Sequence, residues 1–126
     1  MVEPLPLERF PASARLRETS EFLAVRAEGR MVQGRWLRMS VLQRPTEDSP
    51  SPARVGIVTS RRVGGAVQRN RLRRRVREIF RARRGLLPDG IWLVVTAKPG
   101  SSVATFAELR EEWLRLAKRL SILRDP

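Results

Sequence analysis

Residues 60–77 read SRRVGGAVQRNRLRRRVR, and the pattern of this stretch predicts one helix of the fold in detail. Gly64 and Gly65 break the chain, and the helix is predicted from about residue 66 to residue 84. At 100° per residue, apolar side chains fall on one arc of this helix and polar or cationic side chains fall on the opposite arc. The apolar arc holds Leu72, Val76, Ile79 and Phe80, and the opposite arc holds Asn70, Arg74, Arg77 and Arg81. One face therefore packs inward, and the other is cationic.

The positive charge of the chain is concentrated around this helix. The 126 residues include 26 basic and 13 acidic side chains, which gives a net charge of +13. Residues 61–84 hold eleven arginines and one acid, Glu78, so this segment alone carries +10. A single glutamate cannot relieve that repulsion through ion pairs along the helix. The segment is predicted to bind a polyanion, and arginine suits RNA because its planar fork binds phosphates and stacks on unpaired bases.

The composition excludes several kinds of catalytic and structural site. Cysteine and histidine are both absent, which rules out zinc fingers, disulfide scaffolds and histidine acid-base chemistry. No motif places two carboxylates to share a metal, and Glu111 and Glu112 are predicted on a solvent face of the last helix. No apolar run reaches the roughly 20 residues of a membrane span, and no signal peptide is recognisable. We therefore expect a cytoplasmic protein without membrane contact, whose partner carries out any chemistry.

The first half of the chain is predicted to begin with an irregular extension. Residues 1–14 contain three prolines, and residues 15–126 are expected to form a single domain. A short helix is predicted over residues 21–28, capped by Thr19 or Ser20 and ended by Gly29 in the left-handed conformation. Strands are predicted over residues 35–42 and 54–60, joined by the polar connection of residues 43–53.

The second half is predicted to contain a buried strand and an amphipathic helix. Residues 91–95 read IWLVV, the continuous apolar run of a strand covered on both faces. Thr105 and Glu108 have the spacing of a capping box that starts the final helix. The core face of that helix is predicted to hold Leu109, Trp113, Leu116 and Leu120. Two further aromatic residues, Phe22 and Trp36, are compatible either with stacking on unpaired bases or with packing in the core.

Residues 60–77 closely resemble the signature of the protein subunit of bacterial ribonuclease P. In that family a basic-apolar-Gly-x-Ala-Val stretch leads into a helix with the sequence RNR, here Arg69, Asn70 and Arg71. The resemblance extends over roughly residues 15–120 and includes VGIVTSRRVG and IWLVVTAKPG. It implies an α+β fold in one compact domain, with a central, mostly antiparallel four-stranded sheet and about three helices. It also implies a left-handed βαβ crossover through the RNR helix.

The resemblance also implies a function and its partners. Members of the family bind the ribonuclease P RNA, which hydrolyses the phosphodiester that joins the 5′ leader to precursor tRNA. The enzyme is thus an endoribonuclease whose catalysis resides in the RNA, with Mg²⁺ held mainly by that RNA. The protein is expected to bind the catalytic RNA and the leader, to hold no metal through a recognisable motif of its own, and to need no protein partner.

Two groups of site residues follow from matching this sequence to the family pattern. The residues that would face the catalytic RNA are Arg69, Asn70, Arg71, Arg73, Arg74, Arg77 and Arg81. The residues that would contact the leader are Phe22, Arg26, Trp36, Ser60, Arg62 and Ala66. The leader cleft is expected between the first helix and the sheet face that carries Trp36, with Ser60 and Arg62 at its edge.

Two other classes of protein share the charge of this chain. A structural protein that binds ribosomal RNA would have a similar charge and fold but no part in cleavage. A DNA-binding regulator would place the arginine helix in a major groove, but no helix precedes it at turn spacing and Asn70 is its one good base reader.

Overall fold

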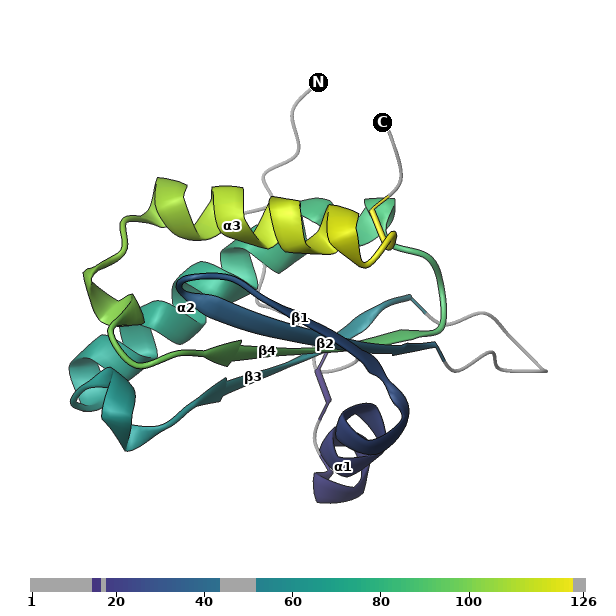
Figure 1. Ribbon diagram of the computed structural model, residues 1–126, viewed down its shortest axis with the longest axis horizontal. Helices are drawn as coiled ribbons and strands as arrows, with labels where there is room; N and C mark the ends of the chain where they lie inside the picture. The colour runs from purple at the N-terminus through teal and green to yellow at the C-terminus, as the bar shows by residue number, and fades with distance from the viewer. Residues whose placement is uncertain (1–14, 17, 44–51, 124–126) are drawn as a thin grey trace.

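The computed structural model describes residues 15–16, 18–43 and 52–123 (Figure 1). In these ranges the chain forms an α+β domain with three α-helices and four strands, as the family resemblance implies. The helices are α1 (Thr19–Glu28), α2 (Ala66–Arg83) and α3 (Phe106–Arg119), and the strands are β1 (Arg30–Gln33), β2 (Leu37–Gln43), β3 (Arg54–Thr59) and β4 (Ile91–Ala97). Short 3₁₀ turns follow β3, α2 and β4, namely η3 (Arg61–Val63), η4 (Arg84–Leu86) and η5 (Ser101–Val103). Residues 1–14 and most of the predicted connection 43–53 lie outside the described ranges.

The four strands form one mixed sheet in the order β1-β2-β4-β3. Two of the three pairings, β1 with β2 and β2 with β4, are antiparallel, and β3 pairs with β4 in parallel. The prediction of a mostly antiparallel four-stranded sheet is therefore confirmed. Because parallel neighbours need a long connection, the chain crosses from β3 to β4 through α2.

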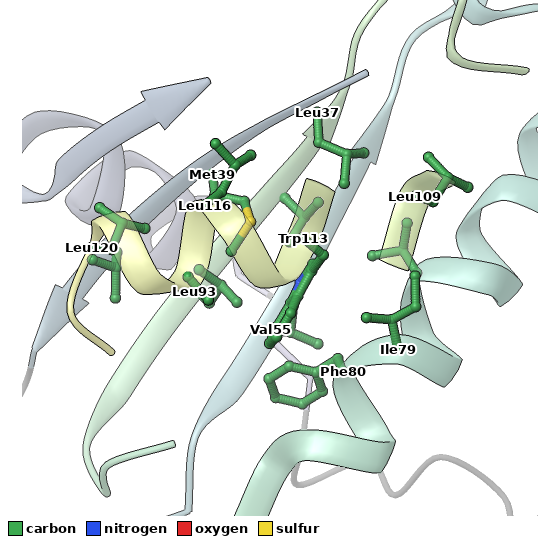
Figure 2. Packing of buried hydrophobic residues seen from close by; sticks show 14 of the residues in the cluster. Leu37, Met39, Val55, Ile79, Phe80, Leu93, Leu109, Trp113, Leu116 and Leu120 are labelled. Carbon is green, nitrogen blue, oxygen red and sulfur yellow. The ribbon is translucent and has the colours of Figure 1, made fainter. Parts of the chain in front are cut away.

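The main core lies between the sheet and the layer formed by α2 and α3 (Figures 1 and 2). The apolar arc predicted for α2 and the core face predicted for α3 are both buried here. Trp113 and Phe80 are the largest fully buried side chains. Figure 2 shows Trp113 between the sheet and α2, close to Phe80 and Val55. The predicted capping box of α3 is confirmed, since Glu108 N donates to Thr105 Oγ1 at 3.1 Å and Thr105 N donates to the Glu108 side chain at 2.9 Å.

The helix α1 packs on the opposite face of the sheet, where a smaller cluster is buried (Figure 1). Leu16, Val25 and Val94 form this cluster, with Phe22 and Trp92 packed against it. Arg54 of β3 ties α1 to the sheet edge through an ion pair with Glu21 at 2.8 Å. The helix covers only part of this face, and the uncovered part is the site described below.

The structure corrects three details of the predicted first helix and first strands. The helix begins at Thr19, two residues earlier than expected, because Glu18 and Glu21 form a capping box in place of a Thr19 or Ser20 cap. Gly29 is extended at φ −83° and not left-handed. Its lack of a side chain matters for space, since a Cβ there would overlap the carbonyl oxygens of Val25 and Val41. The strand β1 was not predicted from the residues, because four mostly exposed side chains leave no apolar alternation.

Candidate nucleic-acid interface

A groove of about 280 Å³ lies between α1 and the uncovered part of the sheet. Its walls are largely apolar, and its polar groups are two arginines and two hydroxyls. The lining residues are Phe22, Leu23, Val25, Arg26, Met31, Arg38, Ser40, Val58, Val94 and Thr96. No carboxylate is among them. The groove therefore combines apolar surface with positive charge, which suits a flexible, anionic ligand with apolar faces.

The pleat of β2 explains which side chains reach this groove. Successive side chains of a strand point to opposite faces, and Leu37, Met39 and Val41 are buried in the core under α2 and α3. Arg38 and Ser40 must therefore point to the face that carries α1. The strand register places Arg38 opposite Thr96 and Ser40 opposite Val94. These neighbours form the floor of the groove.

Phe22 forms one wall of the groove, and its position depends on a glycine in β3. A Cβ at Gly56 would overlap the Phe22 ring, so the absence of a side chain lets the ring lie against the strand backbone. Phe22 is half-buried and also lines a second, smaller cavity of about 120 Å³. One part of the ring is thus packed and another part faces open space, while stacking on unpaired bases stays a prediction.

Phe22 and Arg26 are the predicted leader-contacting residues that the structure brings together in the groove. The prediction that Trp36 shares their face of the sheet is wrong. Trp36 packs against the main core cluster, and the guanidinium carbon of Arg35 lies 4.4 Å from its ring centroid. The residue precedes the first residue of β2 and belongs to the turn after β1, so the alternation of the strand does not apply to it.

The Glu112 carboxylate holds this turn against α3. It accepts hydrogen bonds from the backbone N–H groups of Arg35, Trp36 and Leu37 at 2.8, 2.6 and 2.6 Å. The side chain is 2% exposed, so the prediction of a solvent-facing Glu112 is wrong, while Glu111 is exposed as predicted. Lys98 Nζ donates to the Gly34 carbonyl at 2.8 Å and fixes the same turn from the other side.

Ser60, Arg62 and Ala66 lie just beyond the end of β3 and are exposed. Ser60 Oγ accepts a hydrogen bond from Arg62 N at 3.3 Å and caps η3. Gly64 then turns the chain into α2 at φ 149°, a conformation that residues with a Cβ rarely adopt. Since Val58, two residues before Ser60 on β3, lines the groove, these three residues continue from its edge to the start of α2.

The seven residues predicted to face the catalytic RNA are all on α2 and differ in their surroundings. Asn70, Arg71 and Arg74 are exposed, and Arg69, Arg73, Arg77 and Arg81 are half-buried. Arg73 donates to Asn70 Oδ1 at 3.2 Å, and Arg81 forms an ion pair with Glu78. Two other arginines of the charged segment serve the fold, since Arg75 binds the Ala104 carbonyl at 3.1 Å and Arg84 binds the Ala53 carbonyl at 2.8 Å.

Three arginines converge on the second cavity, which lies between β3 and α2. Arg15, Arg73 and Arg77 line it together with Phe22 and Gly56. Burial lowers the pKa of Arg77, and the positive charges of Arg15 and Arg73 lower it further. Part of the repulsion expected from the sequence thus acts at Arg77, next to the groove. An anionic ligand would relieve it.

Two arginines that line the groove or the second cavity, Arg38 and Arg15, were not singled out from the sequence. The position of Arg38 could have been predicted from the sequence, because it follows the buried Leu37 in β2 and strand alternation directs its side chain away from the core. No comparable signal exists for Arg15. It lies outside every helix and strand, and it reaches the cavity through an isolated bridge to Val55 of β3.

The described residues contain no cluster of three aspartate or glutamate side chains that could hold a metal ion. Within the same ranges, no helix is long and apolar enough to cross a membrane.

Comparison with known sequences identifies related proteins over most of the chain. The family model Ribonuclease P matches residues 10–121. A ribonuclease P protein component from Acidothermus cellulolyticus is 45% identical over 112 residues, covering 89% of this chain and 92% of the relative. The corresponding protein from Thermotoga maritima is 35% identical over 117 residues, covering 90% of this chain and 97% of the relative.

Solved structures agree with this comparison. The ribonuclease P protein from Thermotoga maritima superposes with a TM-score of 0.71 at 35% identity, covering 83% of this chain and 96% of that one. The protein from Staphylococcus aureus superposes with a TM-score of 0.78, covering 88% and 98% of the two chains, and at 20% identity it supports the fold alone. From the family match and the identity of these relatives, this chain belongs to the family of ribonuclease P protein components.

Proposed function

We propose that this chain assembles with a ribonuclease P RNA through α2 and binds the single-stranded 5′ leader of precursor tRNA in the groove beside α1. In this proposal the RNA, with its magnesium ions, hydrolyses the phosphodiester, and the protein increases affinity for the substrate. The observation that carries the proposal is that two arginine-containing sites, the groove and the second cavity, share one aromatic residue. Phe22 lines both the groove and the arginine-lined cavity under α2.

The groove has the properties that an extended single strand requires. Aromatic and apolar side chains accept the faces of any base, at about 1–3 kcal/mol per stacked base, while cations follow the phosphates. Phe22 supplies the ring, and Arg26 and Arg62 are exposed cations at the groove and beyond its edge. A groove of about 280 Å³ lined by apolar side chains favours an unpaired leader, whose bases are free to stack, over a duplex, whose bases are paired and stacked on one another.

The exposed face of α2 has the properties that a folded RNA requires. Arg71 and Arg74 are exposed and can reach phosphates, and Asn70 adds an amide that can make directed hydrogen bonds. The arginine repulsion at Arg77 supports a polyanionic partner on the adjacent flank. The groove and the helix would then engage different parts of one RNA-substrate complex.

The test is a reconstitution of the holoenzyme from this chain and a ribonuclease P RNA. The double variant Arg26→Ala/Arg62→Ala should bind precursor tRNA with a leader of several nucleotides up to about thirtyfold more weakly, because each of the two exposed ion pairs contributes up to about 1 kcal/mol and 1.4 kcal/mol is tenfold in Kd. Its affinity for mature tRNA, which has no leader, should change little. The measurement is the Kd of both tRNAs for the wild-type and variant holoenzymes.

A matched control removes two charges from the other side of the molecule. Lys118 and Arg119 are exposed at the end of α3, so Lys118→Ala/Arg119→Ala should leave both affinities unchanged. Equal losses for precursor and mature tRNA in the Arg26/Arg62 variant would refute leader binding in the groove. Site-specific cleavage by RNA-free protein would refute the assignment of the chemistry to the RNA.

A further inference from the structure

Arg38 has hydrogen-bonding capacity that the fold of the described residues does not use. It lies on the floor of the groove in β2, between the edge strand β1 and β4. Its Nε atom is buried and has no hydrogen-bond partner among the described residues. Leaving a buried donor unpaired costs stability, so the fold of the described residues gains nothing from this nitrogen. The residue is half-buried and lines the groove, so a ligand there would meet the end of the guanidinium group and not the covered Nε atom. None of the residues that line the groove is a carboxylate that could neutralise it.

The surroundings of Arg38 fit a nucleobase better than a phosphate. Phe22, Met31 and Val94 provide apolar surface around the floor, and burying a phosphate against such surface removes it from water. A base has two apolar faces and a polar edge, so it can stack on the walls while its edge meets Arg38 and the hydroxyls of Thr96 and Ser40. The exposed Arg26 on α1 is better placed for the phosphate backbone.

The guanidinium group selects among the bases by its donor pattern. Arginine donates two parallel hydrogen bonds to the O6 and N7 acceptors of guanine, whereas adenine places a donor beside N7. Unpaired cytosine also has two adjacent acceptors, but a purine covers more of the apolar wall. We infer that Arg38 is a specificity-determining residue that reads a guanine of the single strand in the groove through O6 and N7. This inference rests on the proposed function, because it requires the leader to occupy the groove.

The test uses the reconstituted holoenzyme and precursor tRNAs with uridine leaders that carry one guanine, moved position by position. The wild-type holoenzyme should bind the leader with the best-placed guanine about tenfold more tightly than the all-uridine leader. Arg38→Ala should abolish this preference, so that the variant binds the guanine-containing and all-uridine leaders with affinities equal to within about twofold. Arg26→Ala is the matched control, since it should weaken all leaders alike and preserve the preference for guanine.

Modified bases test the same contact without altering the protein. Inosine keeps O6 and N7 and should be bound like guanosine at the preferred position. 7-Deazaguanosine lacks the N7 acceptor and should lose most of the tenfold preference. These two substrates keep the inference testable if Arg38→Ala fails to fold, which a thermal unfolding curve would reveal.

Several outcomes would overturn the inference. An equal loss for all leaders in Arg38→Ala, with a weaker salt dependence, would assign Arg38 to a phosphate. A preference for cytosine over guanine would assign it to another base, and a preference that survives Arg38→Ala would assign the reading to another residue. Leader-dependent binding without any base preference would refute the inference but leave the proposed function intact, whereas binding that ignores the leader would refute the proposed function itself.

Discussion

At the level of single residues, Glu112 joins two segments that are far apart in the sequence. One buried carboxylate receives three backbone N–H groups of a turn that lies more than 70 residues away in the chain. Each hydrogen bond to a charged group contributes about 1.5–3 kcal/mol when the alternative is a buried, unpaired donor. The contact fixes the turn between β1 and β2 and, through it, the start of the strand that carries Arg38.

We predict that Glu112→Gln lowers the free energy of unfolding by about 2–3 kcal/mol. The amide keeps the shape of the side chain but loses the charge and replaces one acceptor oxygen with a donor, which faces the N–H groups of the turn. The neighbouring Glu111→Gln is the control, because Glu111 is exposed and should change the stability by less than about 0.5 kcal/mol. Urea unfolding of the wild type and both variants measures the free energies of unfolding. If Glu112→Gln were as stable as Glu111→Gln, the charge of the Glu112 carboxylate would not be needed to hold the turn.

Within α2, the arginines divide into those that bind the chain's own carbonyls or acids and those that face solvent. Arg75 donates to the Ala104 carbonyl and Arg81 is paired with Glu78, whereas Arg74 is exposed on the outer arc. A net charge therefore overstates the number of cations available to RNA. In the proposed function, α2 would serve both as a part of the core and as the surface that binds RNA. Arginines that are neighbours in sequence would then have different roles.

We predict that the salt dependence of RNA binding separates these arginines. Arg74→Ala should reduce the slope of log affinity against log salt by roughly one unit or less, as expected for one lost phosphate contact. Arg75→Ala should leave the slope nearly unchanged and instead lower the thermal stability, because its hydrogen bond joins α2 to the residue after η5. Titrations of the ribonuclease P RNA at several salt concentrations provide the slopes; identical slope changes for the two variants would contradict this division.

Across the molecule as a whole, the sheet separates a core layer from a partly open face. The helices α2 and α3 bury one face of the sheet, and α1 leaves part of the other face uncovered (Figure 1). The arginine-lined cavity lies where β3 and α2 meet, at the border between these two sides. Much of the net charge of +13 is thus gathered around one edge of the domain, where it opposes folding in the absence of a polyanion.

We predict that the isolated chain becomes more stable as salt is added. Between 0.01 and 0.15 M salt the screening length falls from about 30 to about 8 Å, which weakens repulsion among the arginines. A gain of about 1 kcal/mol would raise Tm by about 3–6 °C for a domain of this size. The variant Arg71→Gln/Arg74→Gln should show a smaller rise, because two repelling charges are gone. A Tm that falls with salt would mean that favourable ion pairs such as Arg54–Glu21 outweigh the repulsion.

Local pattern was sufficient for the elements with strong periodicity. The buried arc of α2, the core face of α3 with its capping box, and the apolar run of β4 follow from spacing alone, and all three are confirmed. These features depend on contacts within a helical turn or on the alternation of one strand, so neighbouring residues contain the information. The cationic surface was predictable for the same reason, since eleven arginines lie within one short segment.

Contacts between distant segments decided the rest. The sequence alone indicated neither β1, whose exposed residues gain their strand pairing from β2, nor the burial of Glu112, which depends on a turn at the other end of the chain. Trp36 turns toward the core because that turn is fixed by α3, and Arg38 faces the groove because β2 lies between two layers. The position of a residue in its helix or strand shows which face of that element its side chain occupies. The surroundings of the side chain depend on which other element packs against that face. Local sequence thus determines the distribution of charge and the positions of the main helices. The floor of the groove, by contrast, forms only when the sheet, α1 and α3 are packed together.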